Sequence, residues 1–249
     1  MSNRFEESFQ LFFDELVSRL SAYLSAIFDD DEVDEEWKEQ IIELLSAVYV
    51  ASSADEVLSI LQQTDVMYDE GMINAITSQI SSSSFVEDEK DRLGTIILAN
   101  FKKLLEGARE LKRDVSNSDD KSLKDEFIAA SMYIMLRFAT SEVHMAQEKA
   151  SLHAGLLVEE VASQYLKEIT ENKQAEVVLY KTWHCHHDGK TCDVCLAMDG
   201  TRVRVDEAFL DEITDDFSGL DYTGGQITYA HPNCRCWVTY DAEEVIIKP

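Results

Sequence analysis

Two short stretches near the carboxyl end contain the residue types that bind metal ions. The first, TCDVC, places Cys192 and Cys195 in a C-x2-C pair. At this spacing one tight turn can present two thiolates to a single ion. The second, HPNCRC, contributes His231, Cys234 and Cys236. We therefore predict a tetrahedral Zn²⁺ site formed by four of these five residues: Cys192, Cys195 and two of the later three.

Four protein ligands would make the site closed and structural. The module that contains them, 177–249, is too small to have a large core, so a metal would stabilise it. Cys234 and Cys236 are separated by one residue. We expect one of the two to face away from the metal unless the strand bulges. Pro232 stiffens the turn that presents them.

Two other interpretations of the cysteines stay open: buried thiols without a metal, and a disulfide between the two stretches. The start of the chain, MSNRFEESFQ, has no apolar core of a secretory signal, and no apolar run is long enough to span a membrane. A protein made in the cytosol seldom keeps structural disulfides, which favours metal. Cys185 is a fifth ligand or a buried thiol.

A histidine-rich stretch, WHCHHD, offers a different chemistry. Its side chains His184, His186, His187 and Asp188 could hold a divalent ion that activates water, as in a metal-dependent nuclease. An exposed strand end that happens to be rich in histidine is the alternative interpretation.

The rest of the chain predicts mostly helices. No proline occurs before Pro232 and few glycines occur before Gly189, while apolar residues recur at steps of three and four. We predict an α+β fold that is predominantly α-helical, with a long helical amino-terminal body and a small carboxyl-terminal β-containing module stapled by zinc. The expected domains are an acidic helical domain over 1–113, a linker over 114–122, and a domain over 123–249 with helices up to residue 176.

Three local signals refine the helices. Ser53 with Glu56, and Ser84 with Glu87, have the spacing of a capping box, so each pair predicts the start of a helix. The segment after the linker reads as one very long helix, or as two that are broken near Gly155.

The formal net charge is −27. Such a charge repels phosphate backbones, so direct DNA binding is disfavoured. The acidic surface either keeps the protein soluble or docks on a basic partner.

In its order of motifs, the chain resembles the carboxyl-terminal domain of tailed-phage minor head proteins, the Mu F-like or head morphogenesis family. Besides the predicted metal ligands, the matching residues are Trp183, Asp188, Lys190, Thr191, Asp199, Gly200, Pro232 and Arg235. An upstream cluster of Arg137, Thr140 and Glu142 is a looser match, Lys190 stands where arginine is commoner, and Gln147 replaces the usual asparagine. The resemblance covers roughly 125–249.

This resemblance implies a virion component without enzymatic activity, present in few copies and bound at the portal vertex inside the capsid. The expected role is capsid assembly or DNA packaging and ejection, with assembly in the host cytoplasm. The expected partners are the portal protein and the major capsid or scaffold protein. No association with a membrane is expected. The alternatives are the metal-dependent nuclease and a zinc-module adaptor that binds other proteins.

Overall fold

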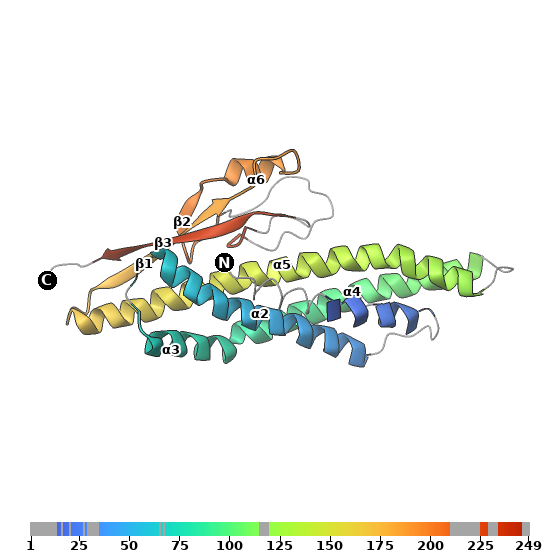
Figure 1. The fold of residues 1–249 in the computed structure, drawn as a ribbon, viewed down its shortest axis with the longest axis horizontal. Helices are drawn as coiled ribbons and strands as arrows, with labels where there is room; N and C mark the ends of the chain where they lie inside the picture. Colours follow the sequence, from blue (N-terminus) through green and yellow to red (C-terminus); the bar gives the residue numbers. More distant parts are fainter. Residues whose placement is uncertain are drawn as a thin grey trace. The chain divides into compact units, whose positions relative to one another are not determined.

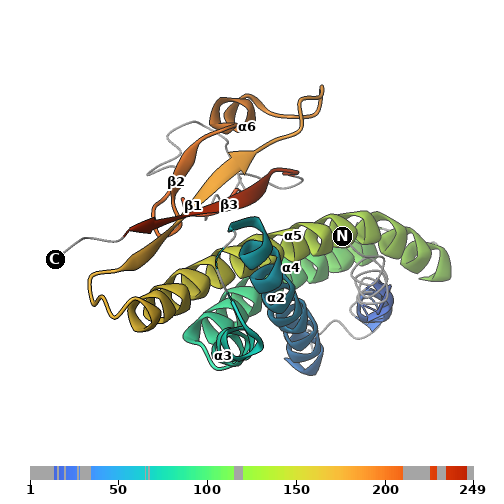
Figure 2. The same ribbon diagram turned by 60° about the vertical axis from the view of Figure 1, so that its left-hand side comes forward.

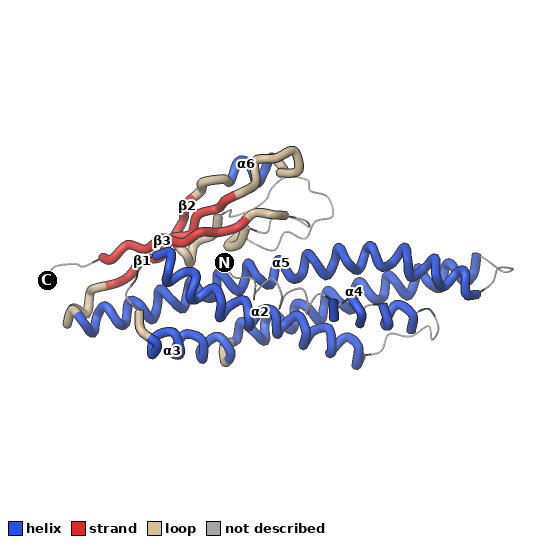
Figure 3. Tube along the Cα trace, in the orientation of Figure 1, coloured by secondary structure: helices blue, strands red, loops and turns tan. Residues whose placement is uncertain are grey.

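Helices predominate in the computed structural model, and a small antiparallel sheet lies near the carboxyl end (Figures 1 and 3). The predicted fold class is therefore confirmed. The structure describes residues 14–15, 17–19, 21–26, 28, 35–64, 66, 68–114, 120–209, 225–228 and 234–245. The elements are α2 (Glu35–Thr64), α3 (Glu70–Ser81), α4 (Ser84–Asp114), α5 (Asp120–Ile169), β1 (Glu176–His184), α6 (Asp193–Met198), β2 (Arg202–Arg204) and β3 (Trp237–Val245). Of the described helices, none has the length and apolar character needed to cross a membrane.

The chain divides into two compact units. The first combines Met1–Val48 with Glu87–Val143, and the second combines Tyr49–Val86 with His144–Pro249. Helices α2, α4 and α5 each contribute residues to both units. The cysteines and the sheet belong to the second unit.

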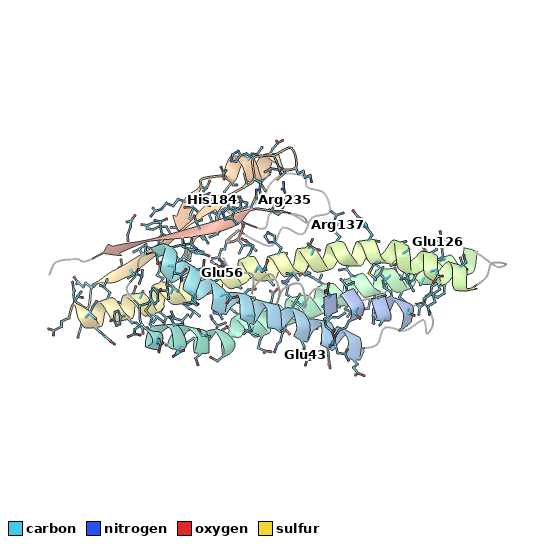
Figure 4. The ribbon with its side chains drawn as sticks, viewed as in Figure 1. Glu43, Glu56, Glu126, Arg137, His184 and Arg235 are labelled. Atoms are coloured by element: carbon cyan, nitrogen blue, oxygen red, sulfur yellow. The ribbon has the colours of Figure 1, made fainter. Side chains whose placement is uncertain are left out.

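The first unit has an apolar core from α2, α4, α5 and the amino-terminal segment. Phe28 and Phe127 meet there with ring centroids 5.5 Å apart. The same unit contains a half-buried guanidinium, because Arg92 donates to both Glu89, at 2.5 and 2.9 Å, and Glu142, at 2.7 Å. Figure 4 labels Glu43, Glu126 and Arg137, which also belong to this unit.

Helix α2 corrects one local prediction. Ser53 does not start a new helix, because α2 runs without a break from Glu35 to Thr64. The Ser53 hydroxyl donates to the carbonyl of Tyr49, one turn earlier, at 2.8 Å. A serine inside a helix can satisfy its hydroxyl in this way, so the capping-box spacing alone does not define a boundary. The other pair agrees with the structure, since α4 begins at Ser84.

Strand β1 is the centre of the sheet, whose order is β2-β1-β3 with both pairs antiparallel. Strand β2 is short and pairs only with residues 180–182. Helix α5 provides acceptors for two further backbone N–H groups of β1. Val177 donates to the Ser163 hydroxyl at 2.9 Å, and Leu179 donates to Glu159 at 2.6 Å. Because buried backbone groups need partners, these contacts join the sheet to α5.

Gly155 lies where α5 meets the sheet (Figure 2). A Cβ atom at this position would lie 2.9 Å from the Tyr240 ring and 3.0 Å from the Val205 side chain. The helix does not break near Gly155, since α5 is one helix of 50 residues. Of the two predicted alternatives, the single long helix is therefore the one observed. The glycine instead permits the close approach of strand and helix.

Lys181, on β1, is buried and connects β1 to two segments that lie later in the sequence. Its ammonium donates to the carbonyls of Val205, at 2.8 Å, and Gln226, at 2.9 Å, and lies 5.0 Å from the centre of the Phe209 ring. The backbone of Phe209 also donates to the carbonyl of Gly225 at 2.5 Å. Phe209 and Gly225 are therefore held next to each other, although 15 residues separate them in sequence.

Candidate metal centre

The cysteines are placed by one short helix and by the segment before the last strand. Cys192 is the N-cap of α6, and its sulfur accepts from the backbone N–H of Cys195 at 3.4 Å. Cys195 projects from the first turn of that helix into the core. Cys234 and Cys236 immediately precede β3, which begins at Trp237. Two segments that are far apart in sequence therefore present thiols to one place.

The thiols of Cys195, Cys234 and Cys236 form one cluster, with all sulfur atoms within 4.8 Å of one another. The sulfurs of Cys195 and Cys234 are 3.8 Å apart, and all three residues are buried. Zinc–sulfur bonds of about 2.3 Å in a tetrahedron separate two sulfurs by about 3.8 Å. The cluster is therefore positioned to bind a metal ion.

The thiols of the cluster resist ionisation in the absence of a compensating charge. Hydrogen bonding with Cys234 and Cys236, followed by burial, raises the pKa of the Cys195 thiol. For Cys236, the bond with Cys195 lowers the pKa, but Cys234 and burial raise it to a net value of about 12. Several buried thiols cannot ionise together unless positive charge compensates them, and a divalent ion supplies that charge.

The prediction that Cys234 and Cys236 would face opposite sides is wrong. Both sulfurs belong to the same cluster, because residues two apart in an extended chain lie on one face, and the exposed Arg235 between them lies on the other. Cys234 also donates to the carbonyl of Thr228 at 3.3 Å, and the Thr228 hydroxyl donates to Glu148 of α5. Burial raises the pKa of Glu148 to about 7, against the opposing effect of the bonds from Thr228.

The remaining predicted ligands stay predictions. Cys192 is half-buried and lies outside the group of three thiols. It lines a small hollow beside the cluster together with His186, Lys190, Thr191, Cys195, Arg235 and Cys236. His231 and Pro232 lie outside the described residues. Cys192 and His231 are thus the two candidates for a fourth ligand.

A charged contact joins the two cysteine segments independently of any metal. Arg235, between Cys234 and Cys236, donates to both carboxylate oxygens of Asp188, at 2.9 and 2.6 Å. Asp188 also accepts from the backbone N–H of Lys190 at 2.9 Å, which closes the turn before Cys192. Arg235, and then the Lys190 N–H, hold the pKa of Asp188 well below its usual range.

The other motif residues have structural positions. Trp183 is fully buried on β1, and its ring meets Phe209 edge to face with centroids 5.3 Å apart. Gly200 has a φ of +79°, which suits glycine, and completes the turn after α6. In the upstream cluster Glu142 is buried and paired with Arg92, whereas Arg137 and Thr140 are exposed.

The histidine-rich stretch does not converge on one ion. His184 bonds to the Thr239 hydroxyl at 2.7 Å, and both His184 and His186 contact the Trp237 ring, with centroids 5.6 and 4.9 Å apart (Figure 4 labels His184 and Arg235). His187 pairs with Asp199 at 2.8 Å, while Asp188 pairs with Arg235. Of the four residues predicted as nuclease ligands, His187 alone joins a group of potential metal ligands in the described part of the chain, together with Cys185 and Asp199.

Sequence reasoning did not identify Glu148, Thr228 or Asp199 as neighbours of the cysteines. Asp199 matched a motif, but its position 14 residues after Cys185 gave no sign that its carboxylate accepts from the Cys185 N–H at 2.9 Å. Glu148 carried one available signal: it lies three residues after Met145 and four before Leu152, a spacing that places an acidic residue on the apolar side of a helix.

Fold and site together define a predominantly helical protein whose small antiparallel sheet carries a cysteine cluster positioned to bind a metal. A family model described as Phage Mu protein F like protein matches residues 106–239, more than half of the chain. The chain therefore belongs to the Phage Mu protein F-like family. Searches of curated proteins and of solved structures gave no match.

Proposed function

We propose that this protein is a minor head protein of a tailed phage, a non-enzymatic component of the virion that acts in head morphogenesis. The observation that carries the proposal is the family match over 106–239, which includes both cysteine segments. On this proposal the protein sits at the portal vertex inside the capsid. It assists capsid assembly or the packaging and ejection of DNA.

The proposed partners are the portal protein and the major capsid or scaffold protein. The net charge of −27 supports protein partners, because an acidic surface repels packaged DNA and can dock on a basic protein face. The test is mass spectrometry of purified virions, together with a pull-down against the portal protein of the same phage. Absence from the particle together with no portal interaction would overturn the proposal.

The proposed metal is a structural zinc ion held by Cys195, Cys234 and Cys236, with Cys192 or His231 as the fourth ligand. When bound, zinc would compensate the thiolate charge and link the turn at α6 to the start of β3. The buried position of all three thiols supports a structural role. Elemental analysis of protein purified without chelator tests this, and well under one zinc per chain would contradict it.

The absence of enzymatic activity has its own test. The full chain is incubated with double-stranded and single-stranded DNA in the presence of Mg²⁺ or Mn²⁺. We expect no cleavage. Cleavage that disappears in His186→Ala would replace this proposal with the metal-dependent nuclease.

A further inference from the structure

A second group of potential metal ligands lies near the turn that carries Cys192. It consists of Cys185, His187 and Asp199, whose ligand atoms all lie within 4.8 Å of one another. Cys185 is buried and is not a member of the three-thiol cluster. The group thus combines sulfur, nitrogen and oxygen ligands that the structural zinc site does not use.

The backbone fixes the positions of these residues. Cys185 and His187 are two residues apart directly after β1, a spacing that brings side chains to one side of an extended chain. Asp199 is the C-cap of α6, and its carboxylate accepts from the Cys185 N–H at 2.9 Å. The turn is tied to β1 because Gly200 donates to the Trp183 carbonyl at 2.8 Å, and Trp183 donates to the Thr201 carbonyl at 2.9 Å.

The chemistry of the three ligands selects a borderline divalent ion. Zinc accepts cysteine, histidine and carboxylate ligands at about 2.0–2.3 Å, whereas calcium and magnesium prefer oxygen alone. The His187 side chain is 69% exposed and can rotate from its 2.8 Å contact with Asp199 to share an ion with it. Because the described residues supply three protein ligands here, one coordination position stays open to solvent.

We propose that Cys185, His187 and Asp199 form a second site for a divalent ion of the zinc type, separate from the three-thiol cluster and open at one coordination position. The two sites differ in access, because the thiols of the first are buried while the imidazole of the second faces solvent. An ion at the second site therefore exchanges faster than one at the first. This site does not depend on the proposed role in the phage head.

The test measures zinc in four forms of the full chain: wild type, His187→Ala, Asp199→Asn and the matched control His186→Ala. His186 is adjacent and exposed but outside the group. Asn at 199 can still accept from the Cys185 N–H and donate to His187, so it removes the charged ligand while keeping the turn. Each protein is equilibrated with Zn²⁺, passed through a desalting column and analysed for metal per chain.

We expect His187→Ala and Asp199→Asn to bind one zinc fewer than wild type while keeping at least one, and His186→Ala to match wild type. A colorimetric chelator should remove the additional zinc of the wild type rapidly and the remainder slowly. Equal zinc in wild type and His187→Ala would overturn the proposal. So would loss of all zinc in His187→Ala, since the two sites would then not be separate. A virion experiment that fails leaves this result unaffected.

Discussion

Asp188 and Arg235 form a two-point ion pair, with oxygen–nitrogen distances of 2.6 and 2.9 Å, between the turn that leads to Cys192 and the segment that holds Cys234 and Cys236. The pair spans the same two segments that the cysteine cluster joins. With zinc bound as proposed, a metal and an ion pair would hold one junction, and the ion pair would orient the ligands without binding the ion.

Substitution of Asp188 should change how fast the metal leaves. Asp188→Asn keeps an acceptor for the Lys190 N–H but removes the charge that Arg235 binds. We expect unchanged zinc content in the three-thiol cluster with faster release to a chelator. The difference should shrink at high salt, because this pair is exposed and therefore screened.

The control for this experiment is Asp241→Asn. It removes an exposed contact between Asp241 of β3 and Arg202 of β2, and neither residue adjoins a cysteine in sequence. Equal acceleration of zinc release in both variants would show that Asp188 has no special relation to the metal centre.

Loss of a cluster thiol should unfold the module. Structural zinc supplies on the order of 10 kcal/mol of folding free energy in small domains. We therefore expect Cys195→Ser to lose the slowly released zinc and the fixed environment of Trp183, measured by tryptophan fluorescence. Far-UV circular dichroism should keep most of its helical signal, because the core of the first unit contains no cysteine. Complete loss of helical signal would contradict this independence.

A methyl group at residue 155 should be costly. Gly155→Ala would place Cβ 2.9 Å from the Tyr240 ring, and overpacking of this kind destabilises a core by about 1–3 kcal/mol. Urea unfolding measures the change. Gly107→Ala is the matched control, because Gly107 is also helical but has no atom within 4 Å of the added carbon. There alanine should stabilise the helix by about 0.5–1 kcal/mol. Two changes of the same sign would contradict the proposed contact.

His153 should make stability depend on pH. It is buried on α5, bonded to the Tyr49 hydroxyl at 2.9 Å and stacked on Phe85, and burial lowers its pKa to about 4. Between about pH 6.5 and 4 the unfolded chain therefore takes up a proton that the folded chain does not. The histidine's contribution to stability is thus present above this window and is lost as the pH falls through it.

The measurement is urea unfolding of wild type and His153→Gln from pH 4 to pH 8. The wild type should lose stability relative to the variant as the pH falls through the window. Glu148, whose pKa of about 7 acts in the opposite direction, is present in both proteins and cancels in the difference. Parallel curves would show that His153 does not titrate differently on unfolding.

The sequence predicts the class of the fold because its signals are local. Absent prolines and apolar periodicity indicate helices, and each of these is a property of neighbouring residues. The ends of the helices are harder to predict, because one side chain can form alternative local hydrogen bonds. Ser53 can cap a helix or bond back to Tyr49, and packing of the continuous α2 decides between them. Gly155 similarly indicates a break by propensity, yet its contact with Tyr240 reflects tertiary packing.

In the candidate site too, local sequence signals predict some features, and tertiary packing decides the others. C-x2-C and C-x-C spacings point to metal, and three of the five predicted ligands meet in the structure. The shared side of Cys234 and Cys236 follows from local geometry, because residues two apart in an extended chain lie on one face. Their meeting with Cys195 depends on tertiary packing, which spacing does not give. The association of Cys185 with Asp199 depends on the turn after α6, whose geometry follows from pairing with β1 and not from spacing.

The closure made by Lys181, Phe209 and Gly225 bears on how this protein can vary. Because hydrogen bonds hold Phe209 beside Gly225, and Lys181 beside Gln226, chain length added between these fixed ends costs little loop entropy. We therefore expect residues inserted in sequence between Phe209 and Gly225 to leave the strands and the cysteines as they are.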